Sequence, residues 1–368
     1  MNSAQIEIQL IASVVAVACA LPGVFLVLRR MAMMADAISH TVLLGIVIVF
    51  FVTRDINSPL LILGATATGV LTVSLVELLN RTRLVKEDAA IGLIFPALFS
   101  VAIILISRFA GDVHLDTDAV LLGELAFAPF ERLELFGLDL GPRALYVMGG
   151  VLALNLTFIA LFYKELKLAT FDPGLAAALG FSPVLIHYGL MALVSVTAVG
   201  AFDAVGSVLV VALMIGPAAA AYLLTDQLAR MLLYSAAMGI GSAVSGYWLA
   251  HWLDASIAGS MATMVGVMFV LVWLLAPERG LLAIARRSAR QRLKFAQTML
   301  AIHLSNHEGR PEASQENRLD ELHTHLHWNP TFTQQVLRQA ERAGLVRSEG
   351  DLLGLTDEGR ELAQQAIR

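Results

Sequence analysis

The first 280 residues alternate long apolar runs with short polar connections. A helix needs roughly twenty consecutive apolar residues to cross the hydrocarbon layer of a membrane, and nine runs approach that length. They cover residues 8–28, 32–52, 59–79, 89–107, 143–163, 183–201, 204–224, 231–252 and 258–276. The pattern predicts an all-α polytopic membrane protein with about nine transmembrane helices, in a permease domain that covers residues 1–282.

The boundary between the sixth and seventh runs is weak. Only Phe202 and Asp203 interrupt the apolar sequence there, and Gly200 and Gly206 flank them. Glycine weakens the interior of a helix, so these residues also fit one broken or re-entrant helix. The sequence therefore leaves eight to ten crossings open.

Composition excludes several classes of protein. Hydrophobic residues make up 57% of the chain and charged residues 15%, and the mean hydropathy is +0.73, which excludes a soluble protein. Cys19 is the only cysteine, so a disulfide scaffold is excluded as well. No lysine follows a glycine, and the phosphate-binding loop of ATPases is therefore absent from the sequence. We expect a transport subunit without its own ATPase site, and not an enzyme.

Positive residues predict the orientation, because arginine and lysine concentrate in cytoplasmic connections. They fall in alternate connections: Arg29 and Arg30; Arg81, Arg83 and Lys86; Lys164 and Lys167; Arg230; and the stretch from Arg279 to Lys294. We expect a multi-pass protein of the cell inner membrane with an external amino terminus and a cytoplasmic C-terminal domain.

Two ionisable residues, Asp36 and His40, lie inside the second apolar run. Such groups are costly within a membrane and mark functional sites. Four residues apart, they share one helical face. A carboxylate and an imidazole can contact a divalent manganese, iron or zinc ion, and an incomplete ligand set holds it weakly, as a conduction pathway requires. The alternative is that the two side chains only bond to each other or to a neighbouring helix.

A short helix is predicted in the connection after Lys167. Asp172 can cap this helix, Pro173 fits its first position and Gly180 can end it. A capped helix on the cytoplasmic face suits the docking of another subunit.

These residues together resemble the permease family of ABC importers for manganese, zinc and iron. The resemblance covers about residues 8–282 and depends on four stretches: Asp36-Ala-Ile-Ser-His40, Glu87–Gly92, Phe171–Gly180 and Val205–Ala219. The first of these is the most specific. Asp203 departs from the family pattern, in which an uncharged polar or basic residue is expected.

The resemblance implies a homodimeric channel, two ATP-binding-cassette ATPase subunits and an extracytoplasmic metal-binding protein that delivers the ion. It implies that Asp36 and His40 contact the metal in transit, and that no cofactor is bound permanently. The ATPase-docking helix would comprise Phe171, Asp172, Pro173, Ala176, Ala177 and Gly180. The sequence does not choose among manganese, zinc and iron.

A more polar tail follows the permease domain. Residues 283–294 form a basic juxtamembrane linker suited to anionic lipid headgroups. The domain covers residues 295–368, and its first helix is expected to begin in the linker. Helices are expected near 290–305, 315–327 and 331–343, followed by a hairpin over 345–355 and a last helix. This order predicts a small cytoplasmic winged-helix (α+β) domain.

The tail is similar to the DNA-binding domain of iron- and manganese-dependent repressors, through Gly344-Leu-Val and Leu355-Thr-x-x-Gly359-Arg-x-x-Ala363. That family would read DNA with the helix 331–343. From Ala296 onward, however, seven arginines stand against eleven acids. DNA affinity depends on neutralising phosphates, so this charge argues against a DNA partner and favours an interaction or regulatory module.

Five of the nine histidines lie in the tail and are candidates for cytoplasmic metal sensing: His303, His307, His323, His325 and His327. His303 and His307, one turn apart, are the better chelating pair. The alternation of the other three spreads their rings around a helix. Ordinary surface histidines are the alternative interpretation.

Two other functions compete with the importer. A secondary metal transporter would need no ATPase, but the internal inverted repeats that it would favour are not evident. A membrane-anchored, metal-responsive transcriptional regulator would require the tail to bind duplex DNA tightly and with strong salt dependence. The importer is our first choice.

Overall fold

The computed structural model describes residues 2–55, 58, 60–109, 125–135, 138–311, 316–319 and 322–367. The chain divides into two compact units, Met1–Gly280 and Leu281–Arg368. Each unit has a hydrophobic core of its own.

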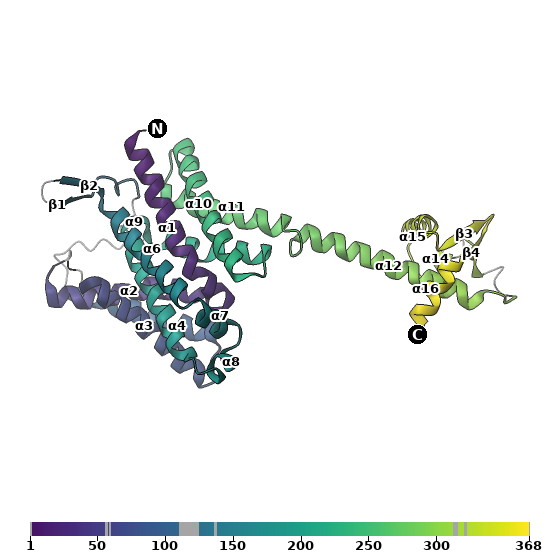
Figure 1. Ribbon diagram of the computed structural model, residues 1–368, viewed down its shortest axis with the longest axis horizontal. Helices are drawn as coiled ribbons and strands as arrows, with labels where there is room; N and C mark the ends of the chain where they lie inside the picture. Colours follow the sequence, from purple (N-terminus) through teal and green to yellow (C-terminus); the bar gives the residue numbers. More distant parts are fainter. Residues whose placement is uncertain are drawn as a thin grey trace. The chain divides into compact units, whose positions relative to one another are not determined.

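The first unit is a helical bundle (Figure 1). Its helices are α1 (Ser3–Leu28), α2 (Ala32–Thr53), α3 (Leu60–Arg81), α4 (Glu87–Phe109), α6 (Arg143–Leu161), α7 (Tyr163–Phe171), α8 (Pro173–Ala178), α9 (Pro183–Leu224), α10 (Leu228–Leu253) and α11 (Ile257–Leu275). Among the described residues, nine helical segments are long and apolar enough to cross a membrane. The prediction of about nine spans is confirmed.

The sixth and seventh spans form one bent element, α9. Gly206, at φ 75° and ψ 165°, interrupts its helical geometry. This backbone conformation is readily available only to glycine, so the helix bends at the position where the apolar runs are joined. The side chain of Asp203 lies outside the described part of the chain.

The core of the bundle forms where α1 and α9 meet. The backbones approach closely, since a Cβ atom on Gly23 would lie 1.9 Å from the carbonyl oxygen of Met214. Buried polar side chains add bonds between helices: the Asn155 amide of α6 donates to the Ala18 carbonyl of α1 at 2.8 Å and to the Thr197 hydroxyl of α9 at 3.0 Å. Interhelical bonds and small residues are the usual means of association in a membrane.

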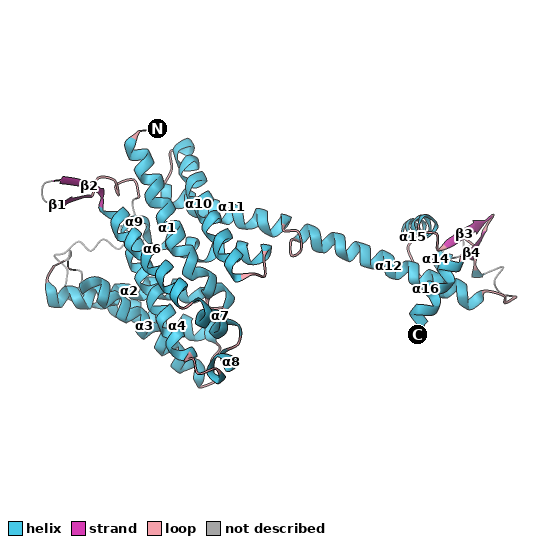
Figure 2. Ribbon diagram, in the orientation of Figure 1, coloured by secondary structure: helices cyan, strands magenta, loops and turns pink. Residues whose placement is uncertain are grey.

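A small hairpin departs from the all-helical expectation for this unit. Strand β1 (Arg132–Leu135) pairs antiparallel with β2 (Leu138–Pro142) directly before α6. Figure 2 shows that the rest of the unit's described secondary structure is helical. The sequence analysis missed these strands because they are only four and five residues long.

The second unit begins with a long helix, α12 (Leu281–His307). The predicted helix began at residue 290, and the basic stretch 283–294 was expected to be a linker; in the structure that stretch is part of α12. The first turns of α12 include Leu281, Leu282, Ala283 and Arg286, which are all strong helix formers. The linker was predicted from the positive charge of this stretch, and positively charged residues do not prevent a helix from forming.

The remaining elements of the second unit are α14 (Leu322–His325), α15 (Pro330–Arg342), β3 (Val346–Glu349), β4 (Leu352–Leu355) and α16 (Asp357–Ile367). The hairpin expected over 345–355 is confirmed, with Glu349 opposite Leu352 across the turn. The helix expected over 315–327 is shorter where it is described, since α14 covers four residues. In its described residues the unit thus consists of the long helix α12, shorter helices and one two-stranded sheet.

Candidate functional site

Asp36 and His40 share one face of α2, as their spacing predicts. His40 Nε2 lies 3.6 Å from Asp36 Oδ1, which is too long for a hydrogen bond. No hydrogen bond of either side chain to another described residue is present. The two side chains are thus close enough to attract each other when the imidazole is protonated, but they are not hydrogen-bonded to each other.

The face that carries this pair is the open face of α2. The side chains of Asp36 and His40 are 37% and 28% exposed in the single chain, and Met33, one turn before, is also exposed. The intervening residues Ala37, Ile38 and Ser39 are buried. Two ionisable groups in an otherwise apolar helix thus lie along a face that the described residues cover only in part.

Two aromatic rings of α4 border the imidazole of His40. Phe95 stacks on it with ring centroids 5.6 Å apart, and Phe99 meets it edge-on at 5.7 Å. Apolar walls limit the positions that the imidazole can take and lower the local dielectric constant. The site therefore consists of two polar groups beside an aromatic wall.

The helix α8 has the caps that the sequence predicts. The Asp172 carboxylate accepts a hydrogen bond from the Leu175 backbone N–H at 2.9 Å, and Pro173 occupies the first turn. Gly180 follows the helix at φ +87°, a left-handed conformation that suits glycine at this position. In Figure 1, α7 and α8 lie at the end of the bundle opposite the amino terminus.

Large apolar side chains are exposed around α8. Phe171 is 57% exposed, Leu175 46% and Leu179 58%, whereas Ala176 is fully buried. Ala176 therefore anchors the helix to the bundle, and Leu175 and Leu179 present its outer surface. Sequence reasoning missed these two leucines because a leucine in a membrane protein carries no signal by itself; their spacing of four on a capped helix is the signal that was available.

Arg29 connects the end of α1 with the segment that leads to α8. Its Nε donates to the Thr170 hydroxyl at 3.1 Å, and its Nη1 lies 3.3 Å from His187 Nδ1 of α9. Burial lowers the pKa of the Arg29 guanidinium to about 10. The Nη2 atom is buried without a hydrogen-bond partner among the described residues. A partly buried cation thus joins α1, α7 and α9 next to the predicted docking helix.

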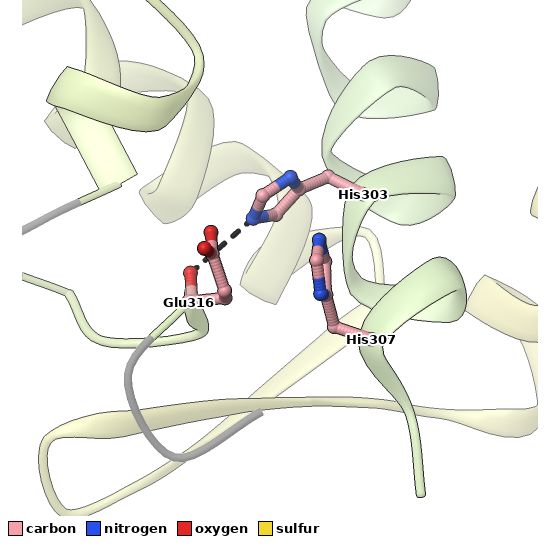
Figure 3. Close-up of side chains that lie close together, drawn as sticks. All are labelled: His303, His307 and Glu316. Carbon is pink, nitrogen blue, oxygen red and sulfur yellow. Dashed lines mark hydrogen bonds between the residues drawn. The ribbon is translucent and has the colours of Figure 1, made fainter. Parts of the chain in front are cut away.

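The tail histidines separate into two groups. His303 and His307, in the last turns of α12, lie beside Glu316, and one ligand atom of each residue lies within 4.8 Å of the others (Figure 3). His325 also approaches this group, with Nδ1 3.0 Å from a Glu316 carboxylate oxygen. His323 and His327 instead contact Thr324, through its hydroxyl and its carbonyl oxygen.

Burial shapes the electrostatics of the first group. The pKa of His303 is lowered, chiefly by burial and also by the neighbouring His307 and His325, while the Glu316 carbonyl and carboxylate oppose the shift. The neutral imidazole, which is the form that binds metals, is thereby favoured. Sequence reasoning missed Glu316, because its separation of nine residues from His307 has no helical periodicity.

Comparison with known proteins gives a consistent result for the first unit. A sequence model described as the ABC 3 transport family matches residues 4–276. The zinc transport system membrane protein TroD of Treponema pallidum is 51% identical over 361 residues, which is 98% of each chain. The manganese transport system membrane protein MntD of Bacillus subtilis is 51% identical over 268 residues, which is 73% of this chain and 90% of that protein.

A solved structure described as PsaBC from Streptococcus pneumoniae in complex with Fab is 28% identical, with a TM-score of 0.62 over 76% of this chain and 94% of that one. The TroD match extends through the second unit, whereas the family model ends before it. The winged-helix assignment of that unit has no support in these comparisons.

Proposed function

Because the chain belongs to the ABC 3 transport family, we propose that it moves zinc or manganese into the cytoplasm along a path lined by Asp36 and His40. The chain is the membrane-spanning permease subunit of an ATP-binding-cassette metal importer. ATP is hydrolysed by a separate subunit in this proposal. The names of the two relatives given above specify zinc and manganese, and iron has no comparable support.

The proposal for the pathway rests on the two ionisable side chains on one face of α2. An aspartate and a histidine inside a span are expensive unless they face a partner or a water-filled path. Neither side chain forms a hydrogen bond to another described residue, and both remain partly exposed. A divalent ion supplies the missing partner, and two ligands hold it weakly enough to release it.

A second copy of the chain would close the pathway. In one chain Met33 is exposed and Asp36 and His40 are partly exposed along α2, and lipid is a poor neighbour for a carboxylate. In a homodimer whose axis passes beside this face, two Asp36–His40 pairs would border one channel. A two-fold interface places the same residues of both copies opposite each other.

The ATPase subunits would dock on α8. Exposed Phe171, Leu175 and Leu179 form an apolar surface on a helix that is fixed by the Asp172 cap and by buried Ala176. Apolar anchors on a rigid element are typical of residues that dominate binding energy. An extracytoplasmic metal-binding protein would deliver the ion at the opposite end.

The positive residues support a cytoplasmic position for α8 and for the second unit, in the inner membrane. The element order of the second unit, with helices followed by the β3–β4 hairpin and α16, supports a winged-helix arrangement. The acidic balance of the tail argues against DNA as its partner.

Reconstituted transport tests the pathway. The chain, its ATPase and its metal-binding protein are placed in liposomes, and ATP-dependent uptake of zinc, manganese and iron is measured for wild type, Asp36→Asn and His40→Gln. Both variants should lose more than about tenfold in uptake, since each removes one of two ligands. Thr66→Val in α3, whose hydroxyl bonds to the Ile62 carbonyl of its own helix, is the matched control and should transport normally. Wild-type uptake in both variants would remove the site from the pathway.

A further inference from the structure

We infer that the second unit holds a metal site of its own, in which His303, His307 and Glu316 bind a divalent cation of the zinc class. The three residues come from the last turns of α12 and from the segment before α14. No other group of three or more such side chains close enough to share an ion occurs in the described residues. This site is separate from the transit residues of α2.

The distances suit a site that closes around an ion. The three ligand atoms lie within 4.8 Å of one another. A tetrahedral ion with bonds of 2.0–2.2 Å separates its ligand atoms by roughly 3.4 Å. The separations between the ligand atoms would therefore have to shorten by about 1.4 Å at most for an ion to bind. Figure 3 shows both imidazoles beside the Glu316 carboxylate.

The hydrogen bonds around the site leave one buried histidine nitrogen without a partner, which a metal ion could supply. His303 Nε2 donates to the backbone carbonyl of Glu316 at 3.2 Å, which keeps the ring next to the segment that supplies the carboxylate. Coordination through Nδ1 would keep this bond, and coordination through Nε2 would replace it. His307 Nδ1 is buried and has no hydrogen-bond partner among the described residues. A buried polar atom left unpaired costs stability, so it needs an explanation. Coordination would bring His307 into a bonded network.

His325 acts as a positioning residue. Its Nδ1 lies 3.0 Å from a Glu316 carboxylate oxygen, and its ring stacks on His303 with centroids 6.2 Å apart. Carboxylates that bind metals are commonly oriented by a further hydrogen bond of this kind. The contact also ties α14 to the site.

The ligand chemistry selects the ion. Two imidazoles and one carboxylate form a borderline nitrogen and oxygen set, which binds zinc more strongly than manganese. Three protein ligands leave the fourth position of a tetrahedral ion to water. All three residues are only partly buried, so the ion can exchange with solvent. An exchangeable site of this kind suits the sensing of metal rather than permanent structural support.

Metal binding would join parts of the tail that are distant in sequence. Glu308, which follows His307, pairs with Arg360 of α16 at 2.8 Å. An ion at the site therefore links the end of α12, and through it α16, with the segment that leads into α14. The tail would be more rigid with the ion than without it.

Zinc titration of the full-length chain in detergent, after removal of metal, tests the inference. The wild-type chain should bind one more zinc ion than the H303Q/H307Q variant. If the variant still binds that ion, its affinity should be more than about 100-fold lower than the wild-type affinity. Cobalt should give the visible absorption of a tetrahedral site in wild type and not in the variant. E316Q, which keeps the shape of the side chain, should weaken binding as well, and H325Q should weaken it by roughly 10–100-fold.

Two control variants make the result specific. H323Q/H327Q removes two histidines from the same segment but outside the cluster, and it should keep the zinc ion and the cobalt spectrum. D36N/H40Q should keep them too, which separates this site from the transport pathway. Equal zinc binding and an unchanged cobalt spectrum in H303Q/H307Q and E316Q would overturn the inference, and so would an equal loss in H323Q/H327Q.

Discussion

The Arg29 side chain donates a hydrogen bond to the hydroxyl of Thr170, 141 residues later in the chain. Arg29 ends the helix α1, which forms the core of the bundle with α9, and Thr170 lies two residues before the cap of α8. The bond therefore connects the centre of the membrane unit with the proposed docking helix for the ATPase. A hydrogen bond from a charged donor is stronger than one between neutral groups.

Thr170→Val should uncouple these two elements. Valine keeps the shape of the side chain but leaves Arg29 Nε unpaired, which costs about 1–3 kcal/mol. We expect a lower thermal unfolding temperature in detergent and a lower ratio of metal transported to ATP hydrolysed. Thr66→Val is the matched control, because the Thr66 hydroxyl bonds only to the Ile62 carbonyl of its own helix. Equal effects of the two substitutions would contradict a specific role for the Arg29 bond.

The apolar surface of α8 should be required for ATPase binding. Leu175→Asp combined with Leu179→Asp places two charges where apolar anchors are exposed. If the two anchors together contribute about 1.4 kcal/mol or more, the affinity for the ATPase should fall by at least about tenfold. Co-purification and binding assays in detergent measure the effect. The permease itself should stay folded, since neither side chain is buried.

Leu84→Asp is the control for this experiment. Leu84 is 88% exposed in the connection between α3 and α4, so the substitution adds a charge without removing an anchor of α8. Normal affinity is expected. If Leu84→Asp weakened binding as much as the double variant, the loss of affinity would come from the added negative charge and not from the loss of the apolar side chains of α8.

Gly23→Ala should destabilise the bundle. The added methyl group would overlap the carbonyl oxygen of Met214, where α1 and α9 are in contact, and overpacking of this kind costs about 1–3 kcal/mol. Gly150→Ala in α6 meets no atom within 4 Å and should be neutral or stabilising by up to about 1 kcal/mol. Thermal unfolding of the two variants in detergent measures the difference. A stable Gly23→Ala variant would show that the helices do not approach this closely.

Removal of the second unit should leave transport intact. A chain that ends at Gly280 keeps the whole first unit, and the MntD match covers 268 residues, which is 73% of this chain and 90% of that protein. Domains with separate cores fold independently, so the uptake rate in liposomes should stay within about twofold of wild type. The zinc ion assigned to His303 and His307 should disappear. Loss of transport in a well-folded truncated chain would show that the tail is needed for the pumping cycle.

Local sequence patterns were sufficient for much of the fold. The nine apolar segments follow from their length, because the membrane thickness sets how many apolar residues a span requires. The cap at Asp172 and the turn between β3 and β4 were predictable, since the interactions that form them lie within four residues. The β1–β2 hairpin was missed, and α12 began earlier than charge alone suggested.

The sequence by itself determined which polar residues lie inside spans and which histidines share a helical face, because both depend on short separations along the chain. Only the tertiary structure decided that Asp36 and His40 stay partly exposed beside Phe95, and that Glu316 joins His303 and His307. Those relationships depend on how separate elements pack. Packing fixes distances between residues that are remote in sequence, and no periodicity along the chain records those distances.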